Sequence, residues 1–503
     1  MSTTVETAGG RVAGKEKGGA HQFRGIPYAA PPVGPLRFRP PQPAEAWTDV
    51  RDGTRFGSIA MQASSPLESM LGGSRTAMSE DCLTLNVVTP AADGSGARPV
   101  LVWIHGGAFL TGSGSTPWYD GTSFATRHDC VVVTVNYRLG AFGFLHLADL
   151  GGERYASSGN AAILDQVAAL EWVRDNIAAF GGDPGNVTVF GESAGAMSVG
   201  TLLGLPAAAG LFRRAIPQSG AASNVVDRDR ATATARKVLA ELGLDEGSVD
   251  QLADIPAESL LAAQTKVVEG AAGGPLAFQP VVDGTALPQS PLDAIAAGSA
   301  ASIDVLTGTN LDEMRLFTTM DPATARIDDA TLLAQCDEIF GAGAGEAAVG
   351  IYRAARSDAP VADVWNAVLS DRVFRVPAVR MAERHRACGA GATYMYLFTW
   401  ATPAFGGVLG ACHALEIPFV FNVLDGPGVA MFTGPVGDDM RTLALAMHDA
   451  WAAFARSGDP NHPGLPAWPV YEEAERPTMV LGASPHVQAD PAGQELRLWA
   501  ELV

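Results

Sequence analysis

The sequence predicts an α/β protein with a large, mostly parallel central sheet flanked by helices. Two short apolar segments rich in β-branched residues, Val100–Ile104 and Val131–Val135, have the composition of buried parallel strands. Apolar side chains from Ile163 to Ile177 then follow helical spacing, and the glycines and proline of residues 181–185 end that helix. Because strands and helices alternate in this way, we expect a doubly wound sheet.

The first 50 residues are predicted to be an extended, turn-rich segment that lies over the surface. Residues 23–43 contain many prolines, which fix the backbone φ angle and lack an N–H donor. No helix is therefore expected in this part of the chain.

The remaining elements continue the alternation of strands and helices. Strands are expected at residues 186–190, 303–306 and 392–400, and helices at residues 193–205 and 438–458. The alanine-rich stretch 225–300 is less regular and is predicted to be a helical insertion over the sheet. Because we see no internal repeat and no long linker, residues 1–503 are assigned to a single domain.

Composition and charge exclude several classes of function. The chain is 47% hydrophobic and 17% charged, as is usual for a globular protein, and its formal net charge is −20. An acidic surface repels phosphate backbones, so no nucleic-acid partner is expected. The chain has no apolar run of about 18 residues, so no membrane span is predicted.

The cysteines indicate a reducing compartment. There are five, Cys82, Cys130, Cys336, Cys388 and Cys412. Their number is odd and no two have the spacing of a metal site, so we expect free thiols and no metal. The N-terminus has no apolar core typical of a signal peptide. We therefore expect a cytoplasmic protein.

Ser193 is the candidate nucleophile. It is the centre of a G-x-S-x-G sequence, Gly191–Gly195, and it lies between a predicted strand and a predicted helix. Such a serine occupies a tight, strained turn that small neighbours allow to close, and the helix N-terminus favours negative charge there. The pentapeptide alone is a weak signal in a glycine-rich chain, but its context makes the catalytic interpretation the better one.

An oxyanion hole is predicted where the strand Val100–Ile104 ends. His105–Gly107 follow that strand directly, and glycines let backbone N–H groups approach a substrate oxygen closely. The expected donors are the N–H groups of Gly106, Gly107 and Ala194. An ordinary glycine turn has the same sequence, so this prediction depends on the pairing with Ser193.

His413 is the candidate base among nine histidines. In this kind of site the chain order is serine, acid, histidine. His413 lies in a loop of small residues just after the strand expected at 392–400, where parallel sheets present catalytic groups. The alternatives are His385, His448, His462 and His486. Of these, His448 is expected on the exposed face of a helix and His462 in a turn.

The acid is one of two neighbours, Asp312 and Glu313, which follow the strand expected at 303–306. Either carboxylate can orient an imidazole and stabilise its charged form, and a solvated loop carboxylate is the alternative. Glu192, beside the serine, is a candidate to support the site through hydrogen bonds. The candidates for lining the substrate pocket, with core packing as the alternative, are Phe109, Phe317 and Phe405.

Several sequence blocks in order carry a family resemblance. They include "FRGIPYAAPPVGPLRFRPP", "SEDCLTLNV", "VWIHGGAF", "VNYRLGAFGF", "GESAGA", "GTNLDEMRLF" and "HALEIPFVF". Over most of its length the chain resembles the type-B carboxylesterases, a family that includes bacterial para-nitrobenzyl esterases and cholinesterases. The resemblance implies an α/β-hydrolase fold with helical insertions over the active site and no cofactor. It also implies Ser193 as nucleophile, His413 as base, and Glu313 rather than Asp312 as acid.

The chain departs from the family pattern at three points. In secreted relatives the cysteine equivalent to Cys82 pairs with one about twenty residues earlier, and no cysteine lies there in this chain. Met314 stands where a glycine often follows the acid. No aromatic equivalent of a choline-binding site is recognised, so cholinesterase specificity is not expected.

The predicted activity is hydrolysis of small-molecule carboxylic esters through an acyl-enzyme, by a monomer or a small homo-oligomer. A carbamate or amide hydrolase would use the same motifs. A non-catalytic binding protein on the same fold is a further alternative, as is a lipase whose lid lies within residues 225–300.

Overall fold

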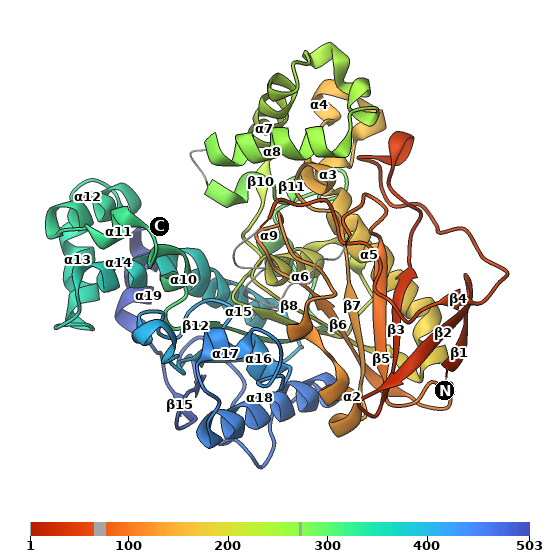
Figure 1. The fold of residues 1–503 in the computed structure, drawn as a ribbon. Coiled ribbons are helices and arrows are strands. Elements are labelled where there is room, and N and C mark those ends of the chain that lie inside the picture. The colour runs from red at the N-terminus through yellow and green to blue at the C-terminus, as the bar shows by residue number, and fades with distance from the viewer. Residues whose placement is uncertain (1, 65–76, 271–273, 503) are drawn as a thin grey trace.

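The structure is a computed structural model that describes residues 2–64, 77–270 and 274–502 (Figure 1). A 13-stranded sheet crosses the molecule in the order β1-β2-β3-β5-β7-β6-β8-β9-β12-β13-β14-β15, with β4 beside β2. Its strands are β1 (Ser2–Thr7), β2 (Gly10–Lys17), β3 (Ala20–Pro27), β4 (Arg51–Asp52), β5 (Thr84–Thr89), β6 (Arg98–Ile104), β7 (Val131–Val135), β8 (Gly182–Glu192), β9 (Arg214–Gln218), β12 (Asp304–Asn310), β13 (Thr393–Phe398), β14 (Thr478–Leu481) and β15 (His486–Gln488). The strands from β7 to β14 in this order are parallel, which confirms the predicted mostly parallel sheet.

Helices cover both faces of this sheet (Figure 1). They are α2 (Thr122–His128), α3 (Gly140–Phe144), α4 (Ala148–Gly151), α5 (Ala161–Asn176), α6 (Ala194–Gly204), α7 (Arg228–Glu241), α8 (Ala257–Gly270), α9 (Pro291–Ala296), α10 (Arg315–Thr318), α11 (Pro322–Ala325), α12 (Asp329–Phe340), α13 (Gly345–Ala354), α14 (Val361–Ser370), α15 (Val376–Cys388), α16 (Ile417–Val420), α17 (Val429–Thr433), α18 (Asp438–Ser457) and α19 (Gly493–Leu502). The strands and helices expected from apolar patterning are all present, with ends shifted by a few residues.

Two hydrophobic cores lie on opposite faces of the sheet. Along β6, Val102 and Ile104 belong to the core that also contains α5, whereas Leu101 and Trp103 belong to the core beneath α18. Successive side chains of a strand point to opposite faces, so a strand covered on both sides needs an unbroken apolar run. This explains why β6 and β7 are recognisable from sequence.

The N-terminal segment differs from the prediction, because three of its stretches are strands rather than surface coil. β1, β2 and β3 pair antiparallel and join the parallel strands through β5. Gly18 and Gly19 have φ angles of +64° and +83°, as a two-residue hairpin turn between β2 and β3 requires. The proline-rich part contains only one short 3-10 helix, Gly34–Leu36.

The segment predicted as a helical insertion is mainly helical. It contains α7, α8 and α9 together with two short strands, β10 (Val226–Asp227) and β11 (Val281–Val282), which pair with each other. α7 and α8 pack together at the top of Figure 1, whereas α9 packs against α6 below them. Only the α7–α8 part is therefore peripheral, and the assignment of the whole chain to one domain stays a prediction.

Candidate active site

The carboxyl ends of four parallel strands bring the predicted site residues together. β6 ends at Ile104, opposite Gly191 of β8, so the loop after β6 lies beside the turn that carries Ser193. Asn310 at the end of β12 is opposite Phe398 at the end of β13, and the segments after these strands carry Glu313 and His413. Ligand sites in open α/β sheets lie at this edge.

Ser193 occupies the strained turn that its sequence context predicts. Its φ and ψ angles are 55° and −124°, and it directly precedes α6. Its backbone N–H donates to the carbonyl oxygen of Gln218 at 3.0 Å, which ties the turn to the end of β9. A non-glycine residue at positive φ costs on the order of 1–3 kcal/mol and persists where the surrounding structure over-determines it. The strain holds the side chain out of both the strand and the helix.

His413 is buried between two carboxylates. Its Nδ1 is 2.6 Å from Oε2 of Glu313, and its Nε2 is 3.0 Å from Oε1 of Glu192. The Glu313 contact is a hydrogen bond, and the Glu192 contact is an ion pair when the ring is protonated. Burial alone would lower the pKa of His413, but the charges of Glu192 and Glu313 outweigh it and raise that pKa well above its usual value.

The structure separates the two neighbouring acids that the residues alone left open. Oε1 of Glu313 accepts the backbone N–H of Asn310 at 2.7 Å, which leaves Oε2 to face the imidazole. Asp312 turns the other way, where Oδ2 accepts the N–H of Ala411 at 2.9 Å and Oδ1 pairs with Arg315. Only Glu313 of the two therefore contacts His413.

Glu416 is a third buried carboxyl at this site, and the sequence reasoning missed it. Its oxygens accept hydrogen bonds from Nε2 of Gln218 at 3.0 Å and Nδ2 of Asn310 at 2.8 Å. Burial, reinforced by the charges of Glu192 and Glu313, raises the pKa of Glu416 to about 8. A glutamate followed at once by the apolar run of residues 417–421 was the available signal, because an acid in such a run must find buried partners.

The loop after β6 approaches the serine closely. A Cβ atom added to Gly106 would lie 2.8 Å from the carbonyl oxygen of Glu192 and 3.0 Å from Cβ of Ser193, so only glycine fits there. His105, the first residue of this loop, is held in place by two contacts. Its Nδ1 is 2.8 Å from the carbonyl oxygen of Gly106, and its ring stacks on Tyr137 at 4.5 Å. Burial lowers the pKa of His105 to about 4, which keeps the ring neutral.

Aromatic rings flank the imidazole. The ring of Phe317 is 5.2 Å from that of His413, and the ring of Phe374, which sequence reasoning missed, is 4.7 Å away. Phe374 lies in a π-helical turn, Asp371–Arg375, a geometry that is frequent at functional sites. Of the other two candidate lining residues, Phe109 is fully buried against Phe144, and Phe405 is 57% exposed.

The expectation that His448 is exposed is wrong. Its ring is fully buried, with Nδ1 2.7 Å from the carbonyl oxygen of Val420 and Nε2 3.0 Å from Oγ of Ser123. His385 is also buried, between Thr393 and the carbonyl oxygen of Ala300. Both rings have structural partners away from Ser193, whereas His413 is held between two glutamates beside the serine turn.

Comparison with known proteins decides the family, because residues 1–499 match the carboxylesterase family. The chain belongs to the carboxylesterase family. It is 42% identical over 496 residues to the para-nitrobenzyl esterase of Bacillus subtilis (strain 168), which covers 98% of this chain and 97% of that protein. It is 38% identical to the phenmedipham hydrolase of Pseudarthrobacter oxydans, with 95% of this chain and 94% of that protein covered.

Comparison with solved structures also finds carboxylesterases. A carboxylesterase from Geobacillus stearothermophilus at pH 6.2 superposes with a TM-score of 0.90 at 47% sequence identity, and 99% of this chain and 100% of that chain are covered. This family membership confirms the predicted α/β-hydrolase fold and makes the protein a carboxylic ester hydrolase. Within the part of the chain that the structure describes, no helix combines the length and the apolar character needed to cross a membrane.

Proposed function

We propose that this esterase works by two-step acyl transfer, with Ser193 as nucleophile, His413 as base and Glu313 as the acid that orients the base. The observation that carries the proposal is the 2.6 Å hydrogen bond between Glu313 and Nδ1 of His413. It fixes the tautomer in which Nε2 is the nitrogen that exchanges protons with the substrate side. The strained turn at Ser193 and the adjacent Gly106 support the remaining roles.

In the first step, neutral His413 accepts the hydroxyl proton of Ser193 while Oγ attacks the ester carbonyl carbon. The negative charge that develops on the carbonyl oxygen is stabilised by the N–H groups of Gly106, Gly107 and Ala194. The ester C–O bond then breaks, and the alcohol leaves with the proton from His413. In the second step, water gives a proton to His413, attacks the acyl-enzyme and releases the carboxylic acid.

We also infer that the protein acts in the cytoplasm. All five cysteines are free in the structure, and four of them are buried. Free thiols persist in a reducing compartment. A monomer or a small homo-oligomer stays the expected assembly.

The test is replacement of the proposed nucleophile. Ser193→Ala removes the attacking oxygen, so kcat/KM for para-nitrophenyl acetate should fall by at least about 10³-fold, as for other triad deletions. Ser198→Ala is the matched control. It lies on α6 beyond the nucleophile, and its hydroxyl accepts a hydrogen bond from Gln166 at 3.0 Å. Retained turnover in folded Ser193→Ala would contradict the assignment.

A para-nitrophenyl ester series from acetate to palmitate, with para-nitroacetanilide as the amide counterpart, then defines the acyl group that the pocket accepts. Hydrolysis of the anilide at a rate near that of the acetate would favour the amide hydrolase alternative. We expect the ester to be strongly preferred.

A further inference from the structure

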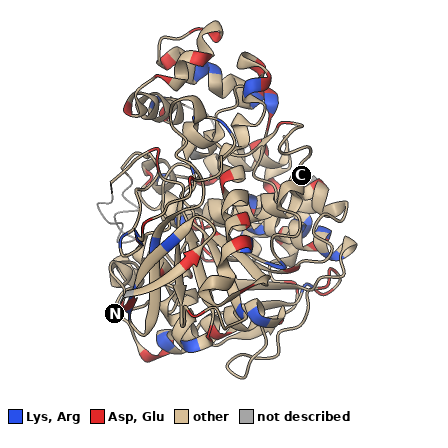
Figure 2. Ribbon diagram, turned by 90° about the vertical axis from the view of Figure 1, so that its right-hand side faces the viewer, with Lys and Arg blue, Asp and Glu red and all other residues tan. Residues whose placement is uncertain are grey.

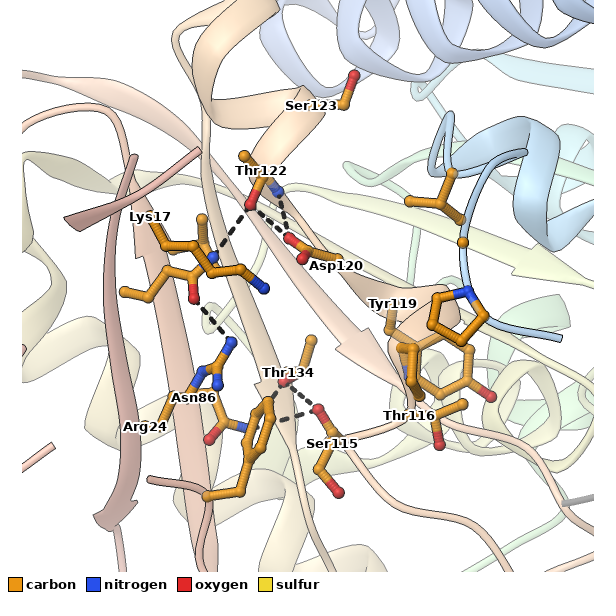
Figure 3. Close-up of a pocket in the computed structure, with 18 of the residues that line it drawn as sticks. Lys17, Arg24, Asn86, Ser115, Thr116, Tyr119, Asp120, Thr122, Ser123 and Thr134 are labelled. Atoms are coloured by element: carbon orange, nitrogen blue, oxygen red, sulfur yellow. Dashed lines mark hydrogen bonds between the residues drawn. The ribbon is translucent and has the colours of Figure 1, made fainter. Parts of the chain in front are cut away.

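A pocket of about 510 Å³ is lined by residues other than Ser193, Glu313 and His413 (Figure 3). Its walls come from β2, β3, β5 and β7 on one side, and from residues 114–123 and 422–427 on the other. None of its lining residues belongs to the proposed triad or the oxyanion loop. Its volume falls in the range of small-molecule sites, about 300–1,000 Å³.

Two cationic side chains, Lys17 and Arg24, reach into this pocket (Figure 3). Within the described part of the chain, Arg24 makes a single side-chain hydrogen bond, from Nη2 to Oε1 of Gln22 at 2.7 Å, and no ion pair. Its guanidinium also stacks 4.1 Å from the ring of Phe56. Burial lowers the pKa of Arg24, opposed by the charge of Asp120. Lys17 makes no side-chain hydrogen bond or ion pair to any described residue.

The acidic residues of the pocket offset only part of this positive charge, because Asp120 acts on Arg24 through its charge without pairing with it directly. Oδ1 of Asp120 accepts the N–H and hydroxyl of Thr122, and Gln22 in turn donates to that hydroxyl at 3.1 Å. Asp120 is therefore linked to Arg24 only through two neutral side chains. Asp425 faces Arg441 instead, with two hydrogen bonds of 2.8 Å. The pocket thus retains about one net positive charge in a chain whose formal net charge is −20.

Hydrogen bonds among the protein's own side chains and backbone fix the remaining polar part of the pocket wall. Oγ1 of Thr134 donates to the carbonyl oxygen of Gly114 at 2.7 Å and accepts from Nδ2 of Asn86 at 3.0 Å. These hydrogen bonds fix the polar floor without drawing on Lys17 or Arg24. Apolar surface completes the lining, from Val88, Pro117, Val423 and Pro427.

We propose that this pocket is a binding site for a compact organic monocarboxylate. The carboxylate is held by the ammonium of Lys17 and the planar N–H groups of Arg24, which suit a carboxylate geometrically. The organic group contacts the apolar wall. An excess of one cationic charge matches one carboxylate, and a neutral molecule leaves that excess charge without a counter-charge.

A bound ligand connects parts of the chain that are far apart in sequence. Nε1 of Trp118 donates to the carbonyl oxygen of Pro427 at 3.0 Å, and Nδ2 of Asn422 donates to Oγ of Ser123 at 3.0 Å. These bonds join the segment after the oxyanion loop to the segment after His413, and the ligand bridges both to β2 and β3. Because it binds only the folded chain, it raises the melting temperature by an amount that grows with the logarithm of ligand concentration above Kd.

The test uses benzoate as probe and benzamide as its neutral counterpart, measured by isothermal titration calorimetry and thermal unfolding of the full chain. We expect saturable binding of benzoate, at least tenfold weaker binding of benzamide, and at least tenfold weaker binding of benzoate by Lys17→Gln and by Arg24→Gln. Asp120→Asn removes the opposing charge and should tighten benzoate binding. Arg51→Gln is the matched control, because that guanidinium also stacks on an aromatic ring, Trp47 at 5.4 Å, but lies outside the pocket.

Three results would overturn the proposal. They are equal binding of benzoate by wild type and the Lys17 and Arg24 variants, equal binding of benzamide, and displacement of benzoate by inorganic phosphate at equal affinity, which would make this a simple anion site. Lys17 is exposed, so its variant decides the question even if half-buried Arg24 proves necessary for folding. Activity toward esters is not used as a readout, so the result does not depend on the proposed triad.

Discussion

At the scale of single residues, the site holds one imidazole among three buried carboxyl groups, Glu192, Glu313 and Glu416. If all three were ionised, the cluster would carry an uncompensated negative charge in a buried place. The raised pKa of Glu416, about 8, keeps that carboxyl mostly protonated at neutral pH, so two carboxylates face one imidazolium. The resting site then carries about one net negative charge, which favours the charged form of His413.

The contact between Glu192 and Nε2 predicts a shift in the pH profile. The carboxylate raises the pKa of His413, and in the proposed mechanism this residue must be neutral to accept the serine proton. Glu192→Gln should therefore lower that pKa and move the rising limb of kcat/KM for para-nitrophenyl acetate toward lower pH, by about one unit for loss of one adjacent charge.

The profile is measured from pH 5 to pH 9 beside Glu171→Gln, an exposed glutamate on α5 that serves as control. A limb that stays in place, or that moves to higher pH, would show that Glu192 does not act on the imidazole.

At the scale of elements, a buried ion pair fastens the segment after β7 to helix α5. Nε and Nη2 of Arg138 donate to the two oxygens of Asp165 at 2.8 and 2.6 Å, and the backbone N–H of Arg138 donates to the same carboxylate. Both side chains are almost wholly buried. Removing one partner leaves the other charge buried and unpaired, which typically costs about 3–5 kcal/mol.

Asp165→Ala should accordingly lower the free energy of unfolding in urea by about 3–5 kcal/mol. Glu171→Ala, on the exposed side of the same helix, should change it by less than about 0.5 kcal/mol. A loss below about 1 kcal/mol in Asp165→Ala would mean that the guanidinium finds other partners.

Elements also differ in how far the sequence predicts them. β6 and β7 were recognisable because burial on both faces leaves an apolar run that needs no tertiary information. β1 to β3 are not predicted as strands, because their mixed polar and apolar side chains at this edge of the sheet form no such run. His448 was misplaced because α18 is covered on more sides than its spacing indicates.

The same limit applies to the site. Ser193 and His413 stand in local sequence patterns that point to chemistry, whereas Phe374 reaches the imidazole only through folding of a distant segment. Glu416 meets its partners Gln218 and Asn310 only once β9 and β12 are in place. The residues alone left Asp312 and Glu313 open, because only the backbone after β12 decides which carboxylate turns inward.

At the scale of the whole molecule, charged side chains are spread widely over the ribbon, whereas most of the thiols are buried. Asp and Glu outnumber Lys and Arg by 54 to 34, and Figure 2 shows both signs interspersed over most of the ribbon. Against this acidic background, the pair Lys17 and Arg24 is notable because the two cations face one pocket. The thiols are mostly hidden, since only Cys388 of the five is exposed.

This burial predicts the reactivity of the cysteines. Burial raises the pKa of the thiols of Cys130 and Cys336 to about 12 and about 11, so these groups are both covered and protonated. Ellman's reagent should modify one thiol quickly in the native protein and all five in urea. Cys388→Ser should abolish the fast phase, and a fast phase that survives would show that a covered cysteine opens readily.

The order of the strands also governs when a growing polypeptide acquires its chemistry. The ribosome completes β8 and Ser193 early, makes Glu313 much later, and reaches His413 another 100 positions on. At about 5–20 residues per second, that last interval alone takes roughly 5–20 s. β13 is synthesised shortly before that point, and under the proposed triad Ser193 lacks its base until His413 follows. If His413 is the base, as proposed, an abortive translation product that stops short of it should be inert toward esters.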